Sequence, residues 1–155
     1  MLFLFSCSHD FKGGRPDFTK TGSEAISEYE KFQIVSLHRN RAHMYGDETF
    51  DVTTVKSIKP LMKEISPTAY QAHKDLLPQA YVHAALVGSL FAFAIIGSNA
   101  ADEDKAKWTG WYWGSAAALL GHGFYVGQRY QQVADKYNKD LKSKFSPALS
   151  FKQDF

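Results

Sequence analysis

Two long uncharged runs dominate the hydrophobic pattern of the chain. The first, residues 76–101, contains no Asp, Glu, Lys or Arg and is rich in Leu, Ile, Phe and Ala, and the second, residues 108–128, is also uncharged. A helix that crosses a bilayer needs about 20 mostly apolar residues. Neither run has the polar stripe that a half-exposed helix of a soluble protein needs. The pattern therefore favours two transmembrane helices over two buried helices of a soluble bundle.

The polar segment "DEDKAK", residues 102–107, separates the two runs. Because this connection is short, the two helices must be antiparallel neighbours. The sequence therefore predicts a mainly α fold: a two-helix transmembrane hairpin with a small polar N-terminal head and a C-terminal amphipathic helical extension. The predicted regions are an apolar N-terminus and tether (1–22), a polar head region (23–65), a helix leading into the first membrane span (66–101), a polar loop (102–107), the second membrane span (108–128) and an amphipathic tail (129–155).

Shorter elements are expected on either side of the hairpin. Residues 23–32 suit a short helix, and the β-branched residues within 32–45 suit a strand or a hairpin that turns at Arg39 and Asn40. In the tail, six apolar residues share one helical face, so the tail is expected to lie either on lipid headgroups or on the head, and to end near Pro147. That face consists of Tyr130, Val133, Ala134, Tyr137, Leu141 and Phe145.

Small residues recur at helical spacing in both runs. Between helices in lipid there is little hydrophobic driving force, so close backbone approach through small side chains supplies much of the association energy. We therefore predict that two small-residue faces pack against each other within the hairpin. They are Ala85, Gly88 and Ala92 in the first run, and Gly110, Gly114, Ala117 and Gly121 in the second.

The N-terminal segment "MLFLFSCSHD" carries a further membrane signal at Cys7, the only cysteine in the chain. An apolar run that ends at Cys7 resembles a bacterial lipobox, in which the cysteine is lipidated after signal-peptide cleavage. The bulk of Phe5 and the absence of Lys or Arg before the run argue against it. Lipidation at Cys7 and a short unprocessed apolar terminus are both open, and a single cysteine permits no intrachain disulfide.

The overall charge limits the classes of partner. With 18 basic and 16 acidic residues, the net charge of +2 leaves no surplus of Lys and Arg for a nucleic-acid interface. The Lys and Arg residues that follow the second span place both termini in the cytoplasm by the positive-inside rule. Lipidation would place them outside the inner membrane instead. The predicted location is the bacterial cell envelope, with inner and outer membrane both open.

Sequence motifs for catalysis are absent. The chain has no Walker loop, no H-E-x-x-H, no G-x-S-x-G and no paired-cysteine metal site. His38 and His43 are close in sequence, but Arg39 and Arg41 lie between them, and this cationic neighbourhood disfavours a metal ion. We expect no catalytic residues, no metal site and no enzymatic activity.

His83 and His122 lie in the two runs at similar distances from the polar loop, so an antiparallel hairpin can bring them together. Intramembrane histidines commonly form hydrogen bonds across helices, and a packing role with a tyrosine, a backbone carbonyl or a headgroup as partner is the expected one. The alternative is that both imidazoles ligate haem, or that one ligates a chlorophyll-type pigment, with adjacent glycines making room for the macrocycle. The sequence favours no bound cofactor.

Ala134, Tyr137, Asn138 and Leu141 form an Ala-x-x-Tyr-Asn-x-x-Leu pattern in the tail. Together with the polar head and the Gly/Ala-rich hairpin, this pattern resembles uncharacterised small bacterial membrane proteins and lipoproteins. The resemblance implies an envelope location and no known catalytic activity. The predicted function is a non-enzymatic, membrane-anchored accessory or structural subunit whose partners are the lipid bilayer and other membrane protein subunits. The alternative is a tetrapyrrole-binding subunit.

Overall fold

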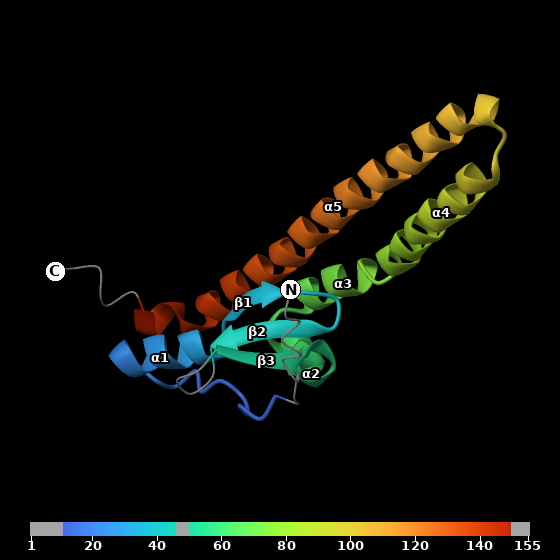
Figure 1. Ribbon diagram of the computed structural model, residues 1–155. Coiled ribbons are helices and arrows are strands. Elements are labelled where there is room, and N and C mark those ends of the chain that lie inside the picture. Colours follow the sequence, from blue (N-terminus) through green and yellow to red (C-terminus); the bar gives the residue numbers. More distant parts are fainter. Residues whose placement is uncertain (1–10, 46–49, 150–155) are drawn as a thin grey trace. The chain divides into compact units, whose positions relative to one another are not determined.

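The computed structural model describes residues 11–45 and 50–149, and it is mainly helical, as the sequence predicts (Figure 1). The chain divides into two compact units. The first, which we call the head, comprises the described residues up to 74 together with the described residues from 130 onward. The second, the hairpin, comprises residues 75–129.

The head contains a three-stranded antiparallel sheet with the strand order β1-β2-β3. Its strands are β1 (Ile34–Leu37), β2 (Arg41–Tyr45) and β3 (Phe50–Thr54). The β1–β2 connection is the turn predicted at Arg39 and Asn40. Next to this turn Leu37 pairs with Ala42, and beyond a register shift between Ile34 and Ser36 the strands pair Ile34 with Met44. Both of these side chains are buried.

Four helices complete the head: α1 (Gly22–Phe32), α2 (Val55–Ile65), α3 (Pro67–Asp75) and the C-terminal part of α5 (Asp102–Leu149). The Ser66 hydroxyl accepts a hydrogen bond from the Ala69 backbone N–H at 3.2 Å, which caps α3 in the manner that Ser followed by Pro predicts. Helix α2 continues through Pro60, and its apolar face is buried in the head. That face consists of Val55, Ile58, Leu61, Met62 and Ile65.

The tail is part of the head unit, and its apolar face is buried there. All six residues of the predicted apolar face of α5 are buried: Tyr130, Val133, Ala134, Tyr137, Leu141 and Phe145. Helix α5 continues to Leu149, past Pro147, so the predicted helix end is wrong by a few residues. The sequence left two positions open for the tail, on lipid headgroups or on the head. In the structure the tail packs within the head.

Asn138 joins the tail to the sheet through two hydrogen bonds. The Ile34 N–H donates to Asn138 Oδ1 at 2.9 Å, and Asn138 Nδ2 donates to the Ile34 carbonyl at 2.7 Å. Ile34 lies on the edge strand β1, where unpaired backbone groups would otherwise invite association with another chain. The amide of Asn138 therefore takes the place of a neighbouring strand at this residue.

The N-terminal tether is part of the head rather than a free linker. Residues 11–21 form no regular element, as their glycines and Pro16 predict, but the Phe11 ring contacts Phe32 at 5.8 Å between centroids. The Phe18 ring contacts Phe145 at 4.9 Å. Apolar side chains set between the polar ones attach this segment to the core.

The hairpin consists of α4 (Gln79–Asn99) and the N-terminal part of α5. The predicted polar loop at 102–107 is wrong, because α5 begins at Asp102 and only residues 100 and 101 connect the helices. Asp102, Glu103 and Asp104 lie in the first turn of α5, where their negative charges interact favourably with the helix dipole. This interaction favours a helix where the sequence pattern alone suggests a loop.

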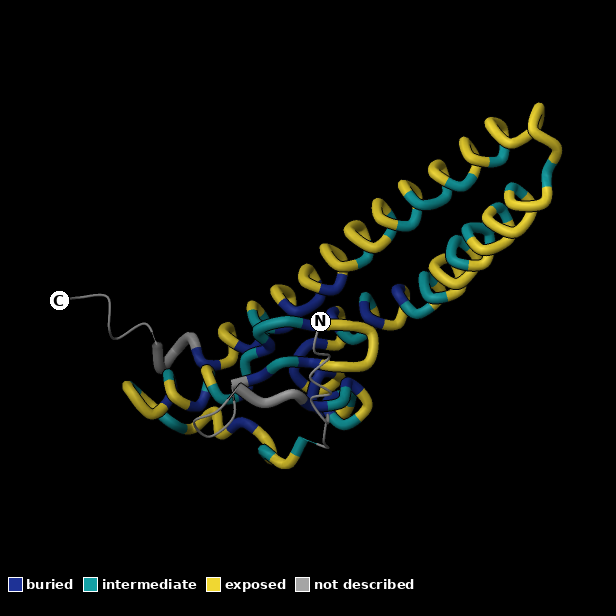
Figure 2. Tube along the Cα trace, in the orientation of Figure 1, coloured by how far each residue is buried: buried dark blue, intermediate teal, exposed yellow. Residues whose placement is uncertain are grey.

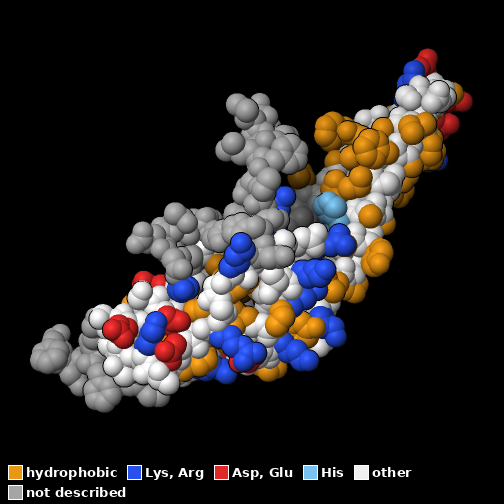
Figure 3. Space-filling view, turned by 90° about the horizontal axis from the view of Figure 1, so that it is seen from below, with side chains coloured by type: hydrophobic (Ala, Val, Ile, Leu, Met, Phe, Trp, Pro, Cys, Tyr) orange, Lys and Arg blue, Asp and Glu red, His pale blue; other side chains and the backbone are white. Residues whose placement is uncertain are grey.

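Helix α4 has no buried residue (Figure 2). Hydrophobic side chains gather on the face of the hairpin that is seen in Figure 3. Within the described residues, the segment 67–99 is the one helical segment that contains a stretch long and apolar enough to cross a membrane. An 18-residue window of this segment has a mean hydropathy of 1.9, and none of the window is buried. The second uncharged run does not meet the same criterion, because its Trp, Tyr, Gly and His122 residues lower the mean hydropathy. The structure is compatible with a membrane location, and the second span stays a prediction.

Candidate functional site

The contact between α4 and α5 within the hairpin follows one seam of half-buried residues. On α5 these residues recur at spacings of three and four, which defines one helical face. They are Trp108, Tyr112, Ser115, Ala116, Leu119, His122 and Val126. The facing residues of α4 include Leu86, Leu90, Phe93 and Gly97. The seam is thus built largely from large side chains.

The predicted small-residue interface is therefore wrong. Ala85, Gly88, Ala92, Gly110, Gly114, Ala117 and Gly121 are all exposed. A Cβ atom added at any of the four glycines would meet nothing within 4 Å. The spacing correctly places these residues on common helical faces. The contact between α4 and α5, however, is formed mainly by the aromatic and aliphatic residues of the seam. The predicted small residues therefore point outward.

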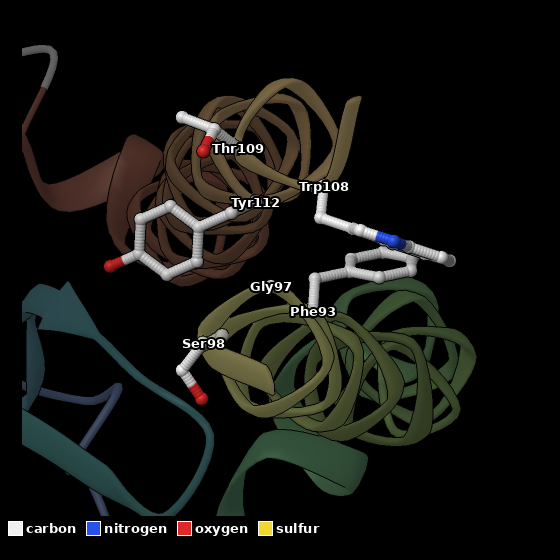
Figure 4. A pocket seen from close by; sticks show the side chains of 7 residues that line it. Phe93, Gly97, Ser98, Trp108, Thr109 and Tyr112 are labelled. Atoms are coloured by element: carbon white, nitrogen blue, oxygen red, sulfur yellow. The ribbon is translucent and has the colours of Figure 1, made fainter. Parts of the chain in front are cut away.

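Gly97 is the glycine at which the two helices of the hairpin come closest. An added Cβ would lie 3.2 Å from Trp108 Cβ. Beside it, the Phe93 and Trp108 rings stack at 6.1 Å with an interplanar angle of 29°, at one side of a cavity of about 300 Å³ (Figure 4). Sequence reasoning missed Gly97, although its position near the connection, opposite Trp108, was a usable signal.

The seam predicts different effects for two matched glycine substitutions. Gly97→Leu should lower the melting temperature of the hairpin in detergent, because overpacking against Trp108 costs about 1–3 kcal/mol. Gly88→Leu should leave stability unchanged or raise it by up to about 1 kcal/mol, because Leu is the better helix former and the site is open. Circular dichroism melts of the full chain check both. Equal changes in melting temperature at the two positions would contradict the conclusion that Gly97 lies in the contact between α4 and α5 and Gly88 lies outside it.

His83 and His122 do meet across the hairpin, as predicted. Their ring centroids are 5.7 Å apart, with an interplanar angle of 37°. His122 Nε2 lies 3.1 Å from Gln79 Oε1, whereas His122 Nδ1 is buried and has no hydrogen-bond partner. The expectation of a hydrogen bond is confirmed, but its partner is a side-chain amide. Gln79 was missed, although it lies one helical turn before His83 and so on the same face of α4.

A second buried histidine, His73, lies in the head. Its side chain is fully buried in α3, and its ring centroid is 5.8 Å from that of Tyr130. Burial lowers the pKa of His73, and the charge of Lys59 lowers it further, while the nearby Arg39 carbonyl opposes the shift. Neither ring nitrogen makes a well-formed hydrogen bond. His73 therefore belongs to the buried core rather than to an open site.

The remaining candidates give no cluster of ligands. Within 11–45 and 50–149, no group of three or more His, Cys, Asp or Glu residues is arranged to hold a metal ion. His38 and His43 lie 5.8 Å apart, and His43 Nδ1 is 2.9 Å from the Ser36 hydroxyl. Cys7, the predicted lipidation site, lies outside the described residues.

Comparison with protein-family models, with curated proteins and with solved structures finds no match to this chain. The resemblance to small envelope proteins therefore stays a prediction. The structure gives its four motif residues a local role: Ala134, Tyr137 and Leu141 are buried in the head, and Asn138 binds the backbone of Ile34.

Proposed function

We propose that this protein is a non-enzymatic, membrane-anchored accessory subunit of a larger bacterial envelope complex. The observation that carries the proposal is helix α4, which is apolar on all sides and has no buried residue. A helix of this kind needs a surrounding apolar medium. The head is the water-facing unit, and the hairpin anchors it and binds other membrane subunits.

The dimensions of the hairpin support insertion. Helix α4 has 21 residues and is therefore about 30 Å long, which matches the hydrocarbon core of a bilayer. Its exposed side chains include Phe91 and Ile95, each 63% exposed. Moving such a side chain out of water is worth about 1.5–3 kcal/mol. Charged residues between the two apolar runs are confined to 102–107, the first turns of α5 next to the connection, where they can stay in water.

The outward direction of the small residues supports docking. Gly88 on α4, and Gly114 and Gly121 on α5, have open space around them. A transmembrane helix of another subunit can approach such a face closely, and close packing is the main source of helix association in lipid. The residues first assigned to packing within the hairpin are thus the ones available to a partner.

Membrane insertion is tested by alkaline extraction of cell membranes that contain the full chain. We expect the protein to stay in the membrane pellet. A control variant with Phe91→Lys and Ile95→Lys should shift toward the supernatant, because a charge near the centre of the span costs about 2.5–3.5 kcal/mol on insertion and a second charge on the same helix adds to that cost. Release of the unaltered protein into the supernatant by carbonate would contradict the proposal that the hairpin is inserted in the membrane.

Docking is tested by a photo-reactive amino acid at Gly114 on the outward face, with Leu119 in the seam as the matched control position. We expect crosslinks to one defined membrane protein from Gly114 and only intrachain crosslinks from Leu119. Gly114→Leu should weaken that complex in mild detergent. A monodisperse lone protein that turns over a small molecule would refute the proposal.

The second candidate function is tetrapyrrole binding, which the proximity of His83 and His122 favours. Two trans axial imidazoles with metal–nitrogen bonds of about 2.0 Å have ring centroids roughly 6.4 Å apart, whereas these centroids are 5.7 Å apart. The rings must therefore separate and admit a macrocycle between the helices. A Soret band that His122→Ala abolishes would support this function, and purified protein without such a band would end it.

A further inference from the structure

The His83 and His122 rings are spaced closely enough to be two ligands of a single metal ion. The two rings come from different helices of the hairpin, and their centroids are 5.7 Å apart. Two imidazoles on one tetrahedral ion, with metal–nitrogen bonds of about 2.0–2.1 Å, have centroids roughly 5.2 Å apart. The observed spacing is closer to this value than to the roughly 6.4 Å of a trans axial pair, and a bare ion needs no room for a macrocycle.

The hydrogen bond to Gln79 determines which nitrogen of His122 is available. Gln79 Oε1 is an acceptor, so a neutral His122 donates its Nε2–H to it at 3.1 Å. The Nδ1 atom then carries the lone pair, and this atom is buried without a partner. A histidine that ligates a metal usually donates its other ring N–H to an oxygen in this way, and that bond fixes its tautomer.

The position of the pair allows water to complete the coordination. His83 is exposed and lies four residues after the start of α4, a rise of about 6 Å. In an inserted hairpin this depth falls near the boundary between headgroups and hydrocarbon rather than at the centre of the bilayer. Two histidines leave at least two positions open, and the described residues provide no third His, Cys, Asp or Glu.

The geometry points to a two-histidine site for one divalent transition-metal ion, Zn²⁺ or Cu²⁺, bound by His83 and by Nδ1 of His122 and oriented by Gln79. Imidazole is a preferred ligand of both ions. The site goes beyond the proposed anchoring role and can fail without affecting it. The similar pair His38 and His43 differs in that Arg39 and Arg41 flank it and Ser36 binds His43 Nδ1, so it serves as an internal comparison.

The test is calorimetric titration of Zn²⁺ into the full chain in mild detergent, purified without a polyhistidine tag. We expect one Zn²⁺ per chain, with affinity at least 10-fold lower in His83→Ala and in His122→Ala. Gln79→Leu should lower the affinity by about 10–100-fold, as removal of the hydrogen bond that orients a ligand does. His83→Cys should keep the ion, because thiolate is also a zinc ligand.

Cu²⁺ electron paramagnetic resonance provides a second readout, in which two coupled nitrogens in the unaltered protein should become one in His83→Ala. The double variant His38→Ala and His43→Ala should keep both signals. The proposal is overturned if the unaltered protein does not bind Zn²⁺, or if both His83→Ala and His122→Ala bind it with unchanged affinity. It is also overturned if the double variant His38→Ala and His43→Ala loses Zn²⁺ binding. Circular dichroism of each variant excludes unfolding as the cause of a loss.

Discussion

Replacing Leu141 with alanine is expected to destabilise the head by about 2–5 kcal/mol. Leu141 is fully buried, and it lies on the face of α5 that packs into the head. Truncation removes contacts from this core and leaves a cavity that the neighbouring side chains fill only in part. The measurement is hydrogen exchange of the full chain in detergent, followed at the backbone amides of α2 and β2.

The matched control is Lys142→Ala, one residue along the same helix at an exposed position. It should change exchange in the head by no more than about 0.5 kcal/mol, as is usual for surface substitutions. The pair also distinguishes the two predicted locations of the tail. If the tail lay on lipid headgroups, Leu141→Ala would weaken membrane association and leave exchange in α2 and β2 unchanged, which would contradict the structure.

Lowering the pH below about 6.5, the usual pKa of histidine, is expected to destabilise the head through His73. The pKa of His73 is lowered by burial and by Lys59 in the folded protein, so the unfolded chain takes up the proton first. Stability is therefore full above the unfolded pKa and falls as the pH drops toward the folded pKa. One proton gives a maximum slope of about 1.4 kcal/mol per pH unit. His43, whose pKa is lowered mainly by burial, adds a change of the same sign.

Hydrogen exchange at head amides between pH 7.5 and pH 5, corrected for the intrinsic exchange rates, measures this loss. His73→Leu should reduce the pH dependence, because it keeps an apolar side chain in the core and removes the titrating group. His38→Gln is the control and should leave the contribution of His73 intact. An unchanged pH profile in His73→Leu would show that the protonation of other groups destabilises the head.

The local elements of the head were largely predictable because each has a signal within a few residues. The β1–β2 hairpin follows from β-branched residues on both sides of Arg39 and Asn40, and the cap of α3 follows from Ser66 before Pro67. The apolar face of the tail follows from helical periodicity and is buried throughout. The attachment of the tether was not predictable, since it depends on ring contacts between Phe11 and Phe32 and between Phe18 and Phe145.

For the candidate site, helical spacing and the antiparallel arrangement suffice to predict that His83 and His122 meet. The same reasoning assigned the small residues to the wrong face, because spacing groups residues on one face but does not state which face meets the other helix. That choice depends on how Phe93, Trp108 and the leucines of the seam fit together.

The sequence by itself determined the mainly helical composition of this protein, its apolar α4 segment and the periodic faces of its helices, because these depend on interactions within a few turns of one helix. Only the tertiary structure decided that the tail belongs to the head, that Asn138 binds the backbone of Ile34 and that Gln79 orients His122. Each of these contacts joins residues 43 or more positions apart in the chain. Such pairs are selected by the packing of whole elements, which no local pattern encodes.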